Sequence, residues 1–163
     1  MSNATTDLTI RDATPDDLPV INQMIHGLAA YERLAHECRS TEAKLRSTLF
    51  GQPRYAECVI ARLEEVPVGF AIFFHNYSTF AAQPGLYLED LFVFPEHRGR
   101  GVGRELLRYL ARLALARNCA RFEWAVLDWN EPAIGFYKSL GAQAMSDWTV
   151  MRVSGEALER LAR

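Results

Sequence analysis

The strongest constraint on the fold is a nearly uninterrupted apolar run from Leu86 to Phe94, broken only by Glu89 and Asp90. A run of this kind predicts a strand in the middle of a sheet, because both faces of such a strand lie against other apolar groups. Pro95 ends the strand, since proline has no N–H to donate to a sheet ladder. The chain must therefore supply further strands and covering layers on both faces.

The rest of the chain alternates between strand and helix signals, which favours an α/β or mixed α+β fold. Further strands are predicted at residues 8–11, 56–63, 66–75 and 122–127, with a tight turn at Glu64-Glu65 and a last strand or hairpin arm at 142–153. Helices are predicted from Thr14 to about Tyr31, Thr41 to Gly51, about Val102 to Asn118, Asn130 to Gly141, and from Ser154 onward.

The size of the chain suits one globular domain, with 163 residues of which 49% are apolar. We expect this domain at residues 5–163, preceded at residues 1–4 by a remnant of an expression vector. The longest apolar run, residues 68–74, is far shorter than the ~20 residues of a membrane span. The net charge of −2 gives no global attraction to nucleic acid or anionic lipid, so we expect neither as a partner.

Cysteine and histidine spacing excludes some classes of site. The three cysteines contain no CxxC pair, and the four histidines lack metal-ligand spacing. We therefore expect a cytoplasmic location, no disulfide scaffold and no metal.

The most informative motif is the glycine-rich turn from Arg98 to Gly103, which lies between the apolar strand and the long predicted helix. Alternating glycines let the backbone approach a ligand closely. The start of a helix offers unpaired N–H groups and the positive end of its dipole, and Arg98 and Arg100 add charge. The turn is therefore a candidate pyrophosphate site.

Several interpretations of this turn compete. A Walker loop is excluded because it needs a Lys followed by Ser or Thr, and a dinucleotide fingerprint fits poorly because the third glycine comes one residue early. A flexible turn with solvated arginines remains an alternative, as does a nucleic-acid surface formed by the seven arginines of residues 96–121. The pattern Arg/Gln-x-x-Gly-x-Gly/Ala is met by Arg98, Gly101 and Gly103, and it resembles the acyl-CoA loop of the GNAT N-acetyltransferase superfamily.

Glu89 and Asp90 are candidate functional acids, because an unpaired carboxylate in an apolar strand is costly. Their side chains should face opposite sides of the sheet unless a bulge intervenes. Either acid could act as a base or bind an amine, and the alternative is a structural carboxylate held by backbone N–H groups.

The stretch from Trp129 to Lys138 opens the next helix. Asn130 is explained by helix capping alone, and Tyr137 falls at a helical spacing that suits a core position.

Three stretches together resemble the diamine (spermidine/spermine) N-acetyltransferases and their thialysine-acetylating relatives: residues 88–93, 98–103 and 128–138. The similarity covers nearly the whole chain, and Ala29-Ala30-Tyr31-Glu32 also fits that family. It implies the GNAT fold, with a twisted and mostly antiparallel sheet flanked by helices on both faces. It further implies acetyl-CoA as cofactor, a small-molecule amine as substrate, direct transfer in a ternary complex, and a homodimer.

The resemblance also implies residue roles. Glu89 would be the base and Tyr137 the acid that protonates the departing thiolate. The cofactor would be held by Leu91, Phe92, Val93, Arg98, Gly99, Arg100, Gly101, Val102, Gly103, Arg104, Asn130 and Tyr137. The amine site would be lined by Tyr31, Glu32, Glu89, Asp90, Glu123, Trp124 and Ala125.

The chain departs from the diamine enzymes after Glu32, where those enzymes carry several further acids and this chain has Arg33. A substrate with one amine and a carboxylate, such as thialysine, therefore stands beside the polyamines as a candidate. A protein or peptide substrate and a non-catalytic acyl-CoA sensor are the remaining alternatives.

Overall fold

The computed structural model describes residues 7–163, so the expected vector remnant at residues 1–4 lies outside the described residues. The chain divides into two compact units, one ending at Ala125 and the other spanning Val126–Arg163. The single domain expected at residues 5–163 stays a prediction.

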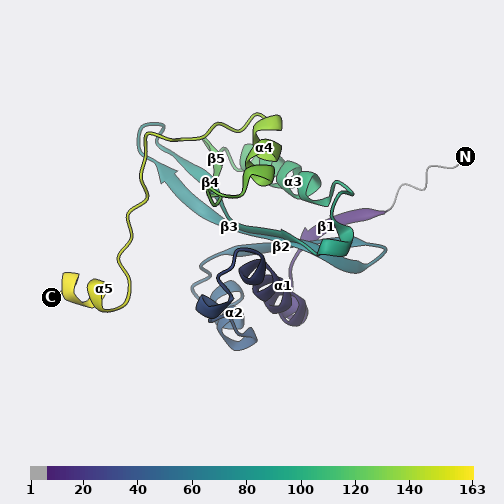
Figure 1. The fold of residues 1–163 in the computed structure, drawn as a ribbon, viewed down its shortest axis with the longest axis horizontal. Coiled ribbons are helices and arrows are strands. Elements are labelled where there is room, and N and C mark those ends of the chain that lie inside the picture. Colours follow the sequence, from purple (N-terminus) through teal and green to yellow (C-terminus); the bar gives the residue numbers. More distant parts are fainter. Residues whose placement is uncertain (1–6) are drawn as a thin grey trace, which may run out of the picture. The chain divides into compact units, whose positions relative to one another are not determined.

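A five-stranded sheet forms the centre of the first unit, in the order β1-β2-β3-β4-β5 (Figure 1). The strands are β1 (Leu8–Asp12), β2 (Glu57–Leu63), β3 (Val66–Ser78), β4 (Gln83–Val93) and β5 (Phe122–Trp124). The first three pairings are antiparallel, and β4 pairs with β5 in parallel. The predicted mixed, mostly antiparallel sheet is therefore confirmed.

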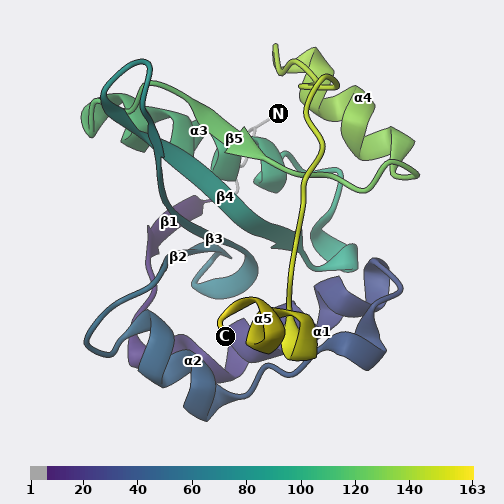
Figure 2. The same cartoon turned by 90° about the vertical axis from the view of Figure 1, so that its left-hand side faces the viewer.

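Helices cover both faces of this sheet, as the apolar β4 run requires. Helices α1 (Leu18–Tyr31) and α2 (Glu42–Leu49) lie on one face and α3 (Val102–Ala116) on the other (Figures 1 and 2). Helix α1 buries Leu18, Ile21 and Met24. Helix α3 buries Val102, Leu106, Leu107, Leu110 and Ala114. Three short 3₁₀ turns complete the unit: η1 (Pro15–Asp17), η2 (Ala35–Glu37) and η3 (Pro95–His97).

The turn between β2 and β3 has the geometry that its sequence predicts. Glu64 and Glu65 both have positive φ, at 48° and 67°. Two successive residues of this kind make the two-residue hairpin turn whose twist matches the flanking strands.

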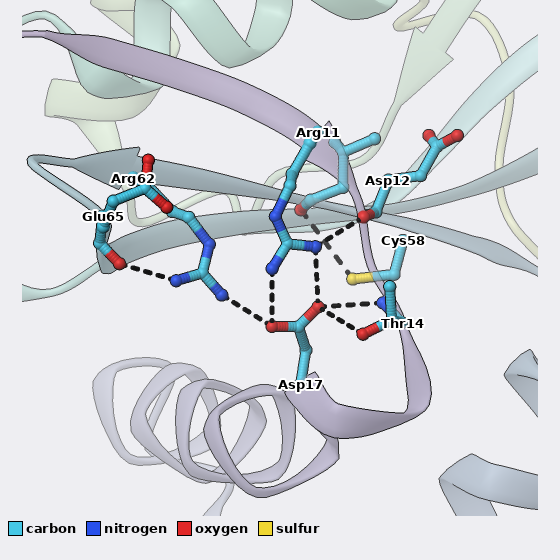
Figure 3. A network of polar contacts seen from close by, with 8 residues as sticks. Arg11, Asp12, Thr14, Asp17, Cys58, Arg62 and Glu65 are labelled. Atoms are coloured by element: carbon cyan, nitrogen blue, oxygen red, sulfur yellow. Dashed lines mark hydrogen bonds and ion pairs between the residues drawn. The ribbon is translucent and has the colours of Figure 1, made fainter.

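A buried acid joins the start of α1 to the sheet (Figure 3). The Asp17 carboxylate lies 3.1 Å from the Arg11 Nη1 and 2.7 Å from the Arg62 Nη2, and it accepts a hydrogen bond of 2.8 Å from the Thr14 N–H. Burial alone would raise the pKa of Asp17, but the bonds from Thr14 and Arg11 and the charge of Arg62 lower it. The cluster fixes β1, β2 and α1 relative to one another.

The second unit contains α4 (Glu131–Ser139) and α5 (Gly155–Leu161). The strand predicted at residues 142–153 is wrong, because this stretch forms no ladder in the described structure and a strand exists only through hydrogen bonds to a neighbour. The predicted strand at residues 122–127 is also too long, since β5 ends at Trp124.

Candidate active site

A β-bulge in β4 brings the two candidate acids together. Leu88 pairs with Phe73 and Asp90 pairs with Ile72, so Glu89 has no partner on β3 and is the extra residue. A bulge of this kind interrupts the alternation of side chains along a strand. The condition under which the two acids could share a face is therefore met.

The residues on either side of the bulge show which face of the sheet the two acids share. Leu88 lies opposite Phe73, whose ring is covered at 5.9 Å by Arg117 from the end of α3. Leu91 also faces α3, since a Cβ built on Gly103 would lie 3.8 Å from the Leu91 Cδ2. Two residues that face α3 thus bracket the acids, which turn toward the α1 side.

A cavity of about 210 Å³ lies on that side, between α1, the η2 turn and β4. Its lining is part apolar and part acidic: Ile25, Leu28, Ala29, Glu32, Leu34, Glu37, Cys38 and Asp90. The acids give the cavity a negative charge, and the apolar wall suits an aliphatic stem.

Burial raises the pKa of two acids in the wall of this cavity. Burial, the charge of Glu89 and the charge of Glu32 together raise the pKa of Asp90 to about 6. Burial also raises the pKa of Glu32. Each carboxylate would gain from a bound cation, because an opposite charge stabilises the ionised form.

The glycine turn leaves room for a ligand at the start of α3. Gly99 and Gly101 have φ of 76° and 82°, and a Cβ built on either would meet nothing within 4 Å. Gly101 caps α3 with no side-chain hydrogen bond, so the first N–H groups of the helix stay available. Arg100 and Arg104 are exposed beside them. This open, positively polarised cradle fits a pyrophosphate.

The side chains at the end of β4 are turned into the protein. Phe92 and Val93 are buried, and the Phe92 ring approaches Gly27 of α1. Only the backbone of these two residues could meet a cofactor. The Arg98 guanidinium lies over the Tyr31 ring at 5.0 Å and over the Phe92 ring at 5.4 Å.

The predicted amine-site residues on β5 have partners of their own. The Glu123 carboxylate lies 2.8 Å from the Arg121 Nε and accepts a hydrogen bond of 3.2 Å from Asn76. The Trp124 ring lies 5.0 Å from the Phe122 ring, and Ala125 follows the end of the strand. Glu123 is thus already neutralised by Arg121.

Asn130 and Tyr137 belong to the second unit. The Asn130 Oδ1 accepts a hydrogen bond of 3.4 Å from the Ala133 N–H and caps α4, so the predicted capping role is confirmed. The Tyr137 ring on α4 lies 5.6 Å from the Phe136 ring. The structure therefore brings Glu32, Glu89 and Asp90 together in the first unit. Asn130 and Tyr137 lie in the second unit.

The model of the acetyltransferase (GNAT) family matches residues 23–142, which span the cavity, the bulge, the glycine turn and α4. The chain is a GNAT acetyltransferase. It is similar to the thialysine N-epsilon-acetyltransferase of Mus musculus, at 37% identity over 94% of this chain and 96% of that protein. It is also similar to the L-ornithine N5-acetyltransferase of Arabidopsis thaliana, at 32% identity over 93% of this chain and 86% of that protein.

Solved structures confirm the fold of this GNAT acetyltransferase. An integron cassette protein from the mobile metagenome of V. cholerae superposes with a TM-score of 0.81 at 25% identity, over 96% of this chain and 98% of that one. A ribosomal-protein-alanine N-acetyltransferase from Brucella melitensis gives a TM-score of 0.74 at 21% identity, over 91% and 99%, and shows the fold alone. The family match and the curated relatives confirm the predicted enzyme class and family.

Sequence reasoning missed part of the acetyltransferase's cavity wall. Leu34, Glu37 and Cys38 line it, because the η2 turn folds back toward α1 after the positive φ of Arg33. No local pattern marks these three residues, because their place in the wall depends on how the η2 turn folds back onto α1.

Two negative findings apply to the described residues of the acetyltransferase. Across residues 7–163 no helix is long and apolar enough to cross a membrane. Over the same span no cluster of three His, Cys, Asp or Glu side chains could hold a metal ion.

Proposed function

We propose that this enzyme transfers the acetyl group of acetyl-CoA to the primary amine of a small cationic molecule, in a direct ternary complex. The observation that carries the proposal is the cavity whose wall includes Glu32 and Asp90 and which adjoins the bulged Glu89. An alkylamine has a pKa of ~10.4 and arrives charged, so an acidic cavity attracts it. The apolar part of the wall accommodates its aliphatic stem.

Glu89 takes the proton that the amine must lose before it attacks. The residue is exposed at the bulge, where water can reach it and relay the proton. Asp90 and Glu32 hold the ammonium group until that transfer. Tyr31 and Trp124 add aromatic wall to the amine site, with Glu123 and Ala125 at its margin.

The residues of the glycine turn fit acetyl-CoA, which supplies an activated thioester to the reaction. The backbone N–H groups of residues 99–104 and the side chains of Arg100 and Arg104 hold its pyrophosphate. The backbone of Leu91, Phe92 and Val93 aligns the pantetheine arm along β4. Asn130 of the second unit contacts the cofactor in addition to capping α4.

Tyr137 donates a proton to the departing thiolate. A thiol has a pKa of ~8.5 and a phenol one of ~10, so the transfer is close to balanced. Acid catalysis of this kind contributes ~10²–10⁴-fold to the rate.

Within the amine class, an amino acid with a side-chain amine is favoured over a polyamine. The curated relatives from Mus musculus and Arabidopsis thaliana are named for thialysine and ornithine, and both compounds carry a carboxylate. Arg33, directly after Glu32, would pair with that carboxylate. We also propose that the enzyme is a homodimer.

The test is CoA release from acetyl-CoA with thialysine, lysine, ornithine, spermidine, spermine, putrescine and a peptide. Preferred turnover of the amino acids supports the carboxylate partner, and preferred turnover of polyamines would instead assign Arg33 no part in binding. Tyr137→Phe should lower kcat ~10²–10⁴-fold while CoA affinity is unchanged. An unaltered kcat in this variant contradicts the acid role. No turnover of any amine, with CoA still bound, would point to a sensor.

A further inference from the structure

We propose that Arg98 is a positioning residue: its guanidinium holds the Tyr31 wall of the amine site against the cofactor turn and does not ligate the pyrophosphate. The inference rests on the proposed function and departs from the expectation that the Arg98 side chain binds the cofactor. It assigns one residue the task of coupling the two substrate sites.

Three contacts engage the Arg98 side chain at the end of β4. Its Nε donates a hydrogen bond of 2.9 Å to the Val93 carbonyl at the end of β4. Its guanidinium lies 5.0 Å from the Tyr31 ring and 5.4 Å from the Phe92 ring. Both distances fall within the ~6 Å range of cation–π contacts. The side chain is therefore engaged by two rings and a carbonyl, and the cradle retains Arg100 and Arg104.

The far side of this stack is fixed by a glycine. A Cβ built on Gly27 would lie 2.8 Å from the Phe92 Cζ, which real Cβ atoms do not tolerate. Gly27 therefore lets the ring lie flush against α1, one helical turn before Tyr31. The layers from α1 through Phe92 to Arg98 form a continuous packed connection.

This packed connection joins the proposed cofactor site to the proposed amine site. Arg98 begins the turn proposed for the cofactor, and Tyr31 immediately precedes Glu32 of the cavity. A cofactor that orders the turn also fixes the Arg98 backbone, and through the guanidinium it fixes Tyr31. Donor binding should then raise amine affinity, and by linkage the amine should raise donor affinity by the same factor.

The chemistry of arginine suits this task better than that of lysine. A guanidinium is planar, so it can stack on two rings while its Nε donates along β4. An ammonium group keeps the charge but loses the planar contact and the Nε bond. Arg98→Lys therefore separates the two roles, because a phosphate contact survives this change better than a stack does.

The decisive experiment compares acetyl-CoA with acetyl-pantetheine, a donor without pyrophosphate, in Arg98→Ala, Arg98→Lys and the neighbouring Arg100→Ala. We expect both Arg98 variants to raise the amine KM about five- to tenfold with either donor, and to change the CoA dissociation constant by calorimetry less than about twofold. Arg100→Ala should weaken CoA binding and leave the amine KM with acetyl-pantetheine unaltered. Gly27→Ala should shift the amine KM in the direction of Arg98→Ala.

The inference is overturned if Arg98→Ala weakens CoA binding while its amine KM with acetyl-pantetheine equals that of the wild type. It is also overturned if Arg98→Lys matches the wild type in amine KM, since charge alone would then suffice. Melting temperatures establish that each variant folds.

A readout without any amine separates failure of this inference from failure of the proposed function. Hydrogen–deuterium exchange of a peptide covering residues 29–34 should slow when CoA binds the wild type. The slowing should be lost in Arg98→Ala and kept in Arg100→Ala. Equal slowing in Arg98→Ala and the wild type contradicts the coupling, whatever the acceptor amine proves to be.

Discussion

Burial of Asp90 favours the protonated, neutral form of its carboxyl group. Its pKa in the folded protein is raised to about 6, chiefly by burial, so the native state binds a proton more tightly than the unfolded chain does. The resulting contribution to stability is complete below the ordinary pKa of ~3.9 and is lost as the pH rises through 6. An ionised Asp90 is thus destabilising until a cation reaches the cavity.

Asp90→Asn should remove this penalty. We expect the free energy of unfolding at pH 8 to rise by about 3 kcal/mol, since the shift from ~3.9 to about 6 is about two units and each unit corresponds to ~1.4 kcal/mol. The fall in stability between pH 4 and pH 6 should flatten, and amine affinity should drop. Urea unfolding at pH 4, 6 and 8 measures the first two effects. Glu65→Gln, at an exposed turn residue, serves as the control, and an equal pH slope in Asp90→Asn and the wild type would contradict the assignment.

Gly101 is the residue on which the shape of the cofactor cradle depends. Its φ of 82° is costly for any residue with a Cβ, by roughly 1–2 kcal/mol. Gly101→Ala should therefore lower the melting temperature and weaken CoA binding, which calorimetry measures directly. Gly135→Ala in α4 is the matched control, because Gly135 has open space around it and no positive φ. Loss of CoA affinity in the control and not in Gly101→Ala would refute the prediction.

At the scale of elements, most strands and helices follow from local signals. The run from Leu86 to Phe94 predicts β4, and the glutamate pair at 64–65 predicts the hairpin between β2 and β3. Thr41 predicts the start of α2, and its side chain caps that helix. The sequence alone could not place the bulge at Glu89, and the two acids could be expected to share a face only if a bulge intervened. Register depends on the partner strand and not on β4 alone. The strand expected at residues 142–153 failed for the same reason, since strand propensity cannot supply a neighbour.

The acids of the site were predictable in the same partial way. Glu89 and Asp90 stand out as charges in an apolar strand, and that argument needs no structure. The contacts of Glu37, Cys38 and Arg98 depend on how the η2 turn and the cofactor turn fold back onto α1. Such contacts join residues distant in sequence, so no local pattern encodes them.

The Asp17 cluster ties three elements together, so breaking it should destabilise the fold. Asp17→Ala leaves the mostly buried Arg62 without its carboxylate, and breaking a buried pair costs about 3–5 kcal/mol. Thermal unfolding should report this loss, and Asp16→Ala, an exposed acid on the same turn, should change stability by less than about 0.5 kcal/mol.

The Asp17 cluster also has a pH signature. The pKa of Asp17 is lowered, so its contribution to stability is present above the ordinary pKa of ~3.9 and is lost as the pH falls through the lower folded value. Asp17→Ala should therefore lose the share of acid-dependent unfolding that belongs to Asp17, while the share of Glu57, whose pKa is also lowered, remains. Parallel acid titrations of the two proteins would refute this role for Asp17.

At the scale of the whole molecule, the second unit carries large apolar side chains that are exposed to solvent. Trp148 is 79% exposed and Met151 86%, and in residues 126–163 no side chain is buried. Exposed apolar groups in such density mark an association surface. This exposure agrees with the proposed homodimer, in which a second copy would cover them.

Trp148→Asp should shift the protein toward the monomer, because a charge opposes burial of this surface. Sedimentation equilibrium over a range of concentrations measures the mass. Phe80→Asp replaces a fully exposed aromatic residue in the β3–β4 turn of the first unit, and it should leave the mass unchanged. A wild type that sediments as a monomer at every concentration would exclude the homodimer.

The bulge in β4 has a genetic consequence. Leu88 and Leu91 are three positions apart and still face the same helix, which an ordinary strand allows only for positions an even number apart. Deleting either acid between them would restore the regular alternation of side chains, and both leucines would still face α3. We expect such a deletion variant to keep the fold with one carboxylate fewer. One extra residue is therefore all that separates this bulged strand from a regular one, and it is what lets Glu89 and Asp90 share a face.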